Sequence, residues 1–186
     1  MENEMDTKIK EIINFVYGET FSEAHLNVLL ENIAKAASVI TEKRKTGWDE
    51  KDVVLITYAD QFSAKGEKAL PVFTRFYNRW LSHSFSHVHL LPFYPWSSDD
   101  GFSVIDYHEV APETGTWRDV AELKKSASLM FDFVCNHMSA KSKWFANYLK
   151  QIPGYSDFFI SVDPETDLSA VTRPRALPLL TPFTLH

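Results

Sequence analysis

The chain has 186 residues, of which 45% are apolar and 24% charged, a balance that indicates a globular domain and excludes wholesale disorder. The formal net charge of −6 argues against a nucleic-acid-binding protein, which usually presents a basic face. No apolar run reaches the roughly 18 residues of a membrane span, and the charged start Met1–Lys10 does not read as a secretory signal. We therefore expect a cytoplasmic protein without a nucleic-acid or membrane partner.

Two amphipathic helices are predicted at the start of the chain. The first ends at Gly18, and the second repeats apolar residues from Leu26 onward, with Thr20 as a possible N-cap and Gly47 as its stop. We take residues 1–50 as an N-terminal helical extension. The apolar face of the first helix consists of Ile9, Ile12, Ile13, Val16 and Tyr17.

Strands and helices alternate in the next part of the chain. Strands are predicted over 53–59, 88–91 and 129–134, and helices over 71–81 and 117–125, with a polar loop over 93–115. The first strand is apolar through its middle, which is typical of a buried parallel strand. This alternation with short connections implies right-handed βαβ units and a parallel sheet. Beyond Asn136 we predict one helix, over 142–150, in an otherwise irregular chain rich in proline.

Three parallel strands cannot close into a barrel. An eight-stranded barrel needs roughly 250 residues, and three strands would leave edges and inward faces unpaired. We therefore expect that further chain belongs after His186.

Several segments, in this order and at these separations, resemble one enzyme family. They are Leu55–Asp60, His89–Phe93, Ser97–Tyr107, Asp132–His137 and the stretch from Asp167 to Pro178. Together they resemble the sucrose phosphorylase-like subfamily of glycoside hydrolase family 13, in the alpha-amylase superfamily. The helical extension is similar to that of glucosylglycerate phosphorylases and is absent from short sucrose phosphorylases.

The resemblance implies an α/β fold, a partial TIM (β/α)₈ barrel. Its first three strands and their helices would occupy residues 51–137, and residues 138–186 would begin a small inserted domain. The active residues of this fold lie on loops at the C-terminal ends of the strands.

The resemblance also implies a retaining transfer of glucose to inorganic phosphate, which needs a nucleophilic and an acid/base carboxyl group. The family places these on the fourth and fifth strands, so we expect no catalytic residue in this chain and no activity from it alone. The partners implied are a small glucoside, most closely glucosylglycerate, phosphate as co-substrate without a cofactor, and the remaining part of the enzyme. The alternative is a truncated, inactive remnant with weak sugar binding or none.

Three residues are implied to hold the glucose. Asp99 would accept two sugar hydroxyls, because carboxylates form strong charged hydrogen bonds, with Asp100 as the alternative. Phe102 would offer an apolar platform to the ring, although it could equally pack under its own loop. His137 would donate to a hydroxyl beside the reacting carbon, where bonds tighten in the transition state.

A second set of residues is implied to support this subsite. Arg175, or else Arg173, would meet phosphate or the acceptor sugar through its planar guanidinium group. Asp132 falls inside the third predicted strand, where a carboxylate needs a partner, and the arginine that the family supplies is not in this chain. The resemblance adds Asn136, Asp106 and Tyr107 as supporting residues.

Histidines and the one cysteine offer alternative chemistry that we do not favour. His83, His87 and His89 lie close in sequence, but no carboxylate or cysteine completes a recognised ligand spacing, so we predict no metal site. Cys135 is the only cysteine of the sequence, so an internal disulfide is impossible, which agrees with a cytoplasmic location. We expect Cys135 to be a small buried apolar side chain.

Overall fold

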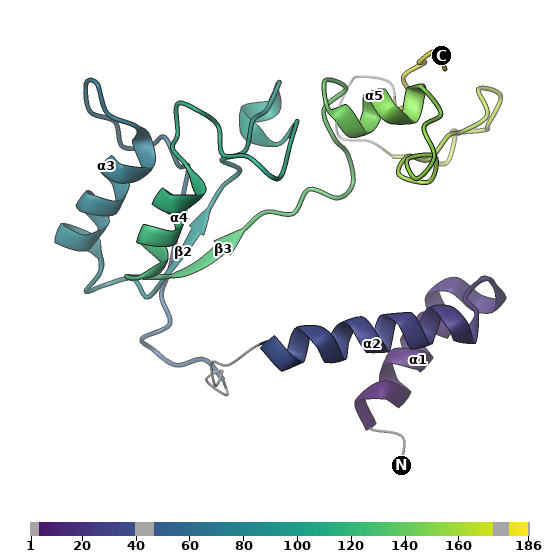
Figure 1. The fold of residues 1–186 in the computed structure, drawn as a ribbon, viewed down its shortest axis with the longest axis horizontal. Coiled ribbons are helices and arrows are strands. Elements are labelled where there is room, and N and C mark those ends of the chain that lie inside the picture. Colours follow the sequence, from purple (N-terminus) through teal and green to yellow (C-terminus); the bar gives the residue numbers. More distant parts are fainter. Residues whose placement is uncertain (1–3, 40–46, 173–178, 186) are drawn as a thin grey trace. The chain divides into compact units, whose positions relative to one another are not determined.

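The computed structural model describes residues 4–39, 47–172 and 179–185. The chain divides into two compact units, Met1–Gly47 and Trp48–His186, shown in Figure 1 in purple to dark blue and in blue to yellow. The two units are described separately below.

The first unit is a pair of helices, α1 (Glu4–Tyr17) and α2 (Glu23–Val39), joined by the short helix η1 (Gly18–Thr20). The predicted end of the first helix is confirmed, and Gly18 has the positive φ of 56° that favours glycine. The second helix was predicted to run beyond Val39, but residues 40–46 lie outside the described residues.

Thr20 does not cap α2, so that prediction is wrong. The Thr20 hydroxyl donates to the Tyr17 carbonyl at 2.5 Å, which closes the turn before the helix instead. Ser22 takes the capping place, because its hydroxyl accepts from the His25 amide at 3.4 Å.

The apolar face predicted for α1 is largely exposed. Leu26 is the one buried residue of the two helices among the side chains that the structure describes, whereas Ile12, Val16 and Tyr17 are exposed. The helical spacing therefore predicted the helices correctly, while the side chains described for them bury Leu26 alone.

The second unit is built on a three-stranded parallel sheet. Its strands are β1 (Val54–Thr57), β2 (His87–Leu90) and β3 (Ser128–Phe131), hydrogen-bonded in the order β1-β2-β3. The predicted parallel sheet is thus confirmed. Asp132 lies one residue beyond β3 and not inside it, because the pairing of β2 with β3 ends at Leu90 and Phe131.

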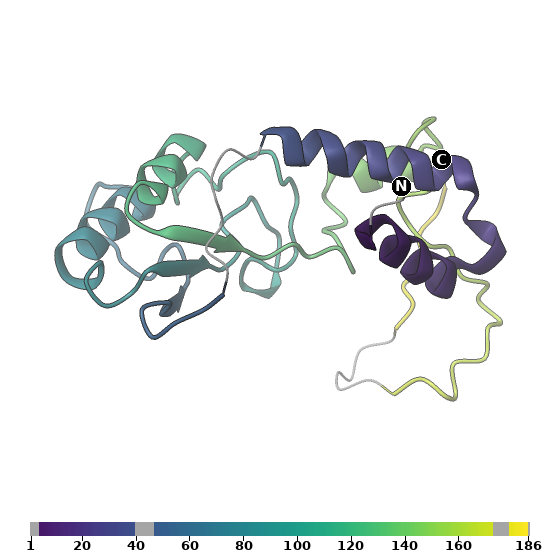
Figure 2. The ribbon, with the colours of Figure 1, turned by 90° about the horizontal axis from the view of Figure 1, so that it is seen from below.

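Helices connect the strands as predicted. α3 (Ala69–Phe76), continued by the π-helical turn η2 (Tyr77–Leu81), leads from β1 to β2, and α4 (Trp117–Lys124) leads from β2 to β3. Figures 1 and 2 show α3 and α4 side by side. A capping box starts α4, in which Thr116 and Asp119 satisfy each other's backbone amides. The helix predicted over 142–150 is α5 (Lys143–Leu149), capped by Ser142.

Within the described residues of the second unit, helices cover one face of the sheet (Figure 1). Val88 and Leu90 of β2 are fully buried in the main core. On the other face, Ile56, His89 and Met130 lie side by side in register, and the exposed fractions of Ile56 and Met130 are 62% and 43%. This open face agrees with the expectation that three strands by themselves leave the inward face of the sheet unpaired, and the described part of β1 is buried on one face alone. The core is formed by Ala59, Leu70, Phe73, Tyr77, Val88, Leu90, Phe93, Tyr94, Val104, Val110, Val120, Leu123 and Ala127.

Candidate functional site

The C-terminal ends of the three strands meet at one edge of the sheet, because all three strands are parallel. The loop after β2 carries Asp99 and Phe102, and the loop after β3 carries Asn136 and His137. The fold therefore brings the predicted glucose-binding residues to the same edge, where parallel α/β folds hold their ligands.

The loop after β2 contains a strained turn, η3 (Asp99–Gly101). The φ angles of Asp99, Asp100 and Gly101 are 63°, 49° and 100°, which places three consecutive residues in a region that side chains disfavour. A Cβ on Gly101 would lie 2.7 Å from the Pro92 carbonyl oxygen. Such strain is often concentrated at ligand sites, where surrounding contacts enforce it.

We expect Gly101→Ala to destabilise the chain more than Gly66→Ala. Gly66 has a φ of 80° and open space around it, so alanine there costs only the left-handed conformation, about 1–2 kcal/mol. At Gly101 the contact with Pro92 adds overpacking of roughly 1–3 kcal/mol. Urea unfolding of both variants measures the difference, and equal losses would show that the Pro92 contact is not what requires glycine.

A hollow of about 280 Å³ lies between the loops after β1 and β2. Its lining combines the aromatic rings of Tyr58 and Trp96 with the carboxylates of Asp60, Asp100 and Glu113. Aromatic faces and carboxylates are groups that bind sugar rings and hydroxyls. The remaining lining residues are Ala59, Pro92, Phe93 and Thr114.

The hollow contains the alternative carboxylate and not the favoured one. Asp100 lines it, whereas Asp99, Phe102 and His137 do not. The structure thus gathers the predicted residues at one edge of the sheet without placing Asp99 and His137 in this cavity.

His137 joins the loop after β3 to the strained turn. Its Nε2 donates to the Phe102 carbonyl at 3.0 Å, and its Nδ1 accepts from the Asn136 side-chain amide at 2.9 Å. The Phe102 amide in turn donates to the Asp99 carbonyl at 3.0 Å. Both imidazole nitrogens therefore have protein partners, so a sugar hydroxyl must replace one of them to reach the ring.

Asp132 has a partner within the chain, which corrects the expectation that it stands alone. His89 Nε2 donates to Asp132 Oδ2 at 2.9 Å across from β2 to the end of β3. Sequence reasoning weighed His89 only as a metal ligand. It missed this pair because the two residues are 43 positions apart.

Two tyrosines lie near the Asp132 carboxylate. Burial raises the pKa of Tyr94, and the neighbouring Tyr107 and Asp132 raise it further. Burial also raises the pKa of Tyr107, whose hydroxyl donates to the Val134 carbonyl at 2.9 Å. Tyr107 thus contacts the segment that leads to His137, and its supporting role at the site stays a prediction.

Serine hydroxyls also tie the second loop to the third. The Ser97 hydroxyl is hydrogen-bonded to those of Ser103 and Ser139, at 3.2 and 2.7 Å. The Ser139 amide donates to the Val104 carbonyl at 2.9 Å. No sequence pattern predicts these contacts, because isolated serines have no characteristic spacing.

The remaining residues singled out from the sequence either make local contacts, are exposed, or lie outside the described residues. Asp106 accepts from the His108 amide at 2.8 Å and so shapes its own turn. Arg175 and its alternative Arg173 lie outside the described residues. Cys135 is exposed, so the prediction of a buried thiol is wrong, because the chain leaves the core as soon as β3 ends.

The described ranges contain neither a metal-binding cluster nor a membrane-spanning helix. Within residues 4–39, 47–172 and 179–185, no group of three or more His, Cys, Asp or Glu side chains could hold a metal ion. Across the same part of the chain, no helix has both the length and the apolar character to cross a membrane.

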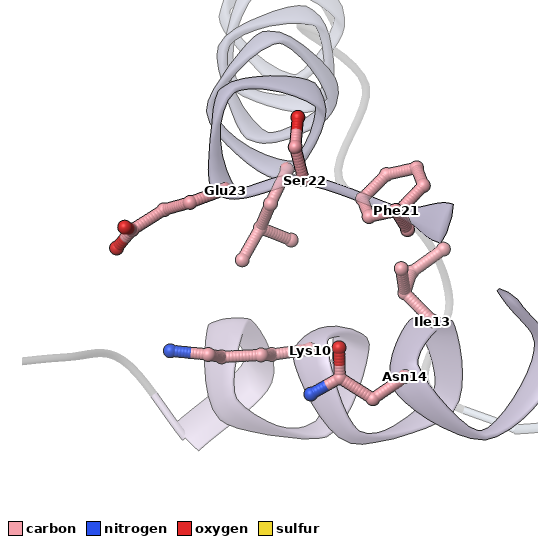
Figure 3. Close-up of a pocket in the computed structure, with 7 residues that line it drawn as sticks. Lys10, Ile13, Asn14, Phe21, Ser22 and Glu23 are labelled. Carbon is pink, nitrogen blue, oxygen red and sulfur yellow. The ribbon is translucent and has the colours of Figure 1, made fainter. Parts of the chain in front are cut away.

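The helical unit has a hollow of its own, of about 260 Å³. Figure 3 shows Lys10 and Asn14 of α1 facing Glu23 at the start of α2, with Phe21 and Ile13 at one end. Its opposite charges and apolar end indicate packing between two helices more than a defined ligand.

A family model and related sequences both match this chain. The sequence profile of the alpha-amylase catalytic domain matches residues 83–178. The glucosylglycerate phosphorylase of Escherichia coli (strain K12) is 64% identical over 182 residues, which are 98% of this chain and 33% of that protein. The sucrose phosphorylase of Streptococcus mutans is 39% identical over 112 residues, 59% of this chain and 22% of that protein.

A solved structure supports the fold. The sucrose 6F-phosphate phosphorylase of Thermoanaerobacter thermosaccharolyticum matches with a TM-score of 0.52 and 32% identity, over 60% of this chain and 22% of that one. With the three parallel strands, this confirms the α/β prediction of a partial TIM barrel. The chain spans about a third of the length of the glucosylglycerate phosphorylases that it matches.

Proposed function

The chain belongs to the alpha-amylase family, and on that premise we propose that it forms the first part of the catalytic barrel of a retaining glucosyl-transferring phosphorylase. The reaction is the conversion of glucosylglycerate and inorganic phosphate to glucose 1-phosphate and glycerate. The extent of the matches supports this acceptor, because the similarity to a glucosylglycerate phosphorylase covers 98% of the chain and that to a sucrose phosphorylase 59%.

The contribution of this chain is part of the glucose-binding subsite. Asp99 accepts hydroxyls of the sugar, Phe102 lies against its apolar face, and His137 donates to a hydroxyl near the reacting carbon. One observation supports this assignment: His137 Nε2 lies 3.0 Å from the Phe102 carbonyl oxygen, so the loops after β2 and β3 are neighbours at the C-terminal edge of the sheet. In the complex a sugar hydroxyl takes the place of this carbonyl as the acceptor of the Nε2 proton.

Phosphate is the co-substrate in this proposal, without a cofactor. Arg175 contacts phosphate or the acceptor, with Arg173 as its alternative, because a guanidinium group donates in pairs to tetrahedral oxyanions. The enzyme acts in the cytoplasm, which a sequence with a single cysteine suits.

The alternative function is sugar binding without catalysis. The observation that favours it is that the hollow at this edge of the sheet is lined by Asp100 and not by Asp99, Phe102 or His137. In that case the residues at the sheet edge bind a glucoside weakly or not at all, and no bond is broken.

A chimera separates these two functions. The 182-residue segment of the Escherichia coli relative that matches this chain is replaced by the corresponding residues of this chain. The chimera and the chain alone are then incubated with 2-O-α-glucosylglycerate and phosphate, with sucrose as the control substrate, and glucose 1-phosphate is measured.

We expect the chimera to form glucose 1-phosphate from glucosylglycerate, and the chain alone to form none above background. A folded but inactive chimera would contradict the proposed function. Turnover by the chain alone would contradict the expectation that it has no catalytic carboxyl groups.

A further inference from the structure

His89 lies on the uncovered face of the sheet, in a row of otherwise apolar residues. Its neighbours in register are Ile56 and Met130, and neither side chain offers the imidazole a strong hydrogen-bond acceptor. Side chains alternate along a strand, so Asp132, two residues after Met130, returns to this same face. The pair at 2.9 Å keeps only 19% and 24% of its side-chain surface exposed.

The segment after β3 is held by hydrogen bonds and not by burial. Phe133 is 78% exposed and Cys135 is also exposed, so neither side chain anchors the segment in the core. Its hydrogen-bonded links to other elements are the Asp132 carboxylate to His89, the Val134 carbonyl to Tyr107, and His137 to the Phe102 carbonyl. The Phe133 ring adds a contact with the Tyr107 ring, at 5.8 Å between centroids.

The link between Asp132 and His89 lies where the pairing of β2 with β3 ends. Strand pairing with β2 stops at Phe131, so Asp132 is the first residue that the sheet no longer aligns. A carboxylate tied to the neighbouring strand sets the direction in which the chain leaves the sheet, five residues before His137.

We propose that His89 is a positioning residue, which fixes the start of the segment 132–137 through Asp132 and thereby places His137 at the substrate. The kinetic part of this inference rests on the proposed function. Misplacing a catalytic or binding group by about 1 Å can lower a rate by roughly 10²-fold, so loss of the link reduces turnover without removing any group that touches the sugar.

The kinetic test compares two changes at His89 in the active chimera. Leucine fills a similar space without a donor, whereas glutamine keeps an N–H that can donate to the Asp132 carboxylate. We expect His89→Leu to lower kcat about 10- to 100-fold with less than about a threefold change in KM, and His89→Gln to recover kcat to within about fivefold of the original.

His87 supplies the matched control. It lies two residues earlier on the same strand, where its ring contacts Ser86 and Trp48, away from Asp132. We expect His87→Leu to leave kcat unchanged. The inference is overturned if His89→Leu keeps full turnover, or if glutamine fails to rescue a folded variant.

A second readout does not depend on activity. With 15N-labelled histidine in this chain, which has seven histidines, NMR follows the imidazole nitrogens of His137 directly. We expect His89→Leu to shift these signals and His89→Gln and His87→Leu to leave them in place. Unchanged His137 signals in His89→Leu refute the positioning role, whereas an inactive parent chimera refutes the proposed function alone.

Discussion

Asp99→Asn is expected to lower kcat/KM for phosphorolysis by the chimera about 100-fold, and Asp100→Asn by less than about threefold. Asparagine keeps the shape of aspartate, but it loses the charge and one of the two acceptor oxygens. Hydrogen bonds to charged groups contribute about 1.5–3 kcal/mol, and each 1.36 kcal/mol is tenfold in rate. Loss of one charged contact to a glucose hydroxyl therefore corresponds to about 100-fold.

The comparison is matched, because both residues have left-handed backbone angles, 63° and 49° in φ. Asparagine tolerates that conformation, so neither change adds backbone strain. The resemblance assigns the sugar contact to Asp99, whereas the hollow beside Trp96 is lined by Asp100. A large loss at Asp100 with little at Asp99 would move the contact by one residue and make this hollow the glucose subsite.

Leu90→Ala is expected to destabilise the chain by about 2–5 kcal/mol, and Ile56→Ala by less than about 1 kcal/mol. Leu90 is fully buried between the sheet and its helices, whereas Ile56 is 62% exposed on the other face. The first change leaves a cavity that the packed core cannot close, and the second removes methyl groups that already meet water. Urea unfolding followed by tryptophan fluorescence gives both values.

Equal losses at the two positions would contradict the exposed face of the sheet. They would mean that Ile56 is covered in solution, as an unpaired sheet face allows when chains associate. Sedimentation at several concentrations then decides whether a second copy provides the cover.

Much of the fold was predictable because the apolar periodicity changes from helical spacing to continuous runs at the strands. The parallel order also followed, since a helix lies between each pair of consecutive strands. The boundaries were less certain: Asp132 was predicted inside a strand that ends at Phe131. Strand length depends on where the neighbouring strand stops pairing, and that is not visible in β3 itself.

The candidate site was predictable where it rests on short segments. Asp99, Phe102 and His137 come to the same edge of the sheet as expected, because loops at the ends of parallel strands meet there. Their side-chain partners were not predictable. The hydrogen bond from His137 to the Phe102 carbonyl joins residues 35 positions apart. Every residue has a backbone carbonyl, so the sequence does not indicate which one accepts the bond.

The sequence by itself determined the helical extension, the alternation of strands and helices, and the chain order of the groups proposed to bind a sugar. These properties follow from the local spacing of residue types, which does not depend on contacts between distant parts of the chain. Only the tertiary structure decided which residues of β1 lie on the open face of the sheet, that His89 is the partner of Asp132, and that Asp100 lines the hollow. Those outcomes depend on register and loop conformation, which arise from contacts between residues far apart in the chain.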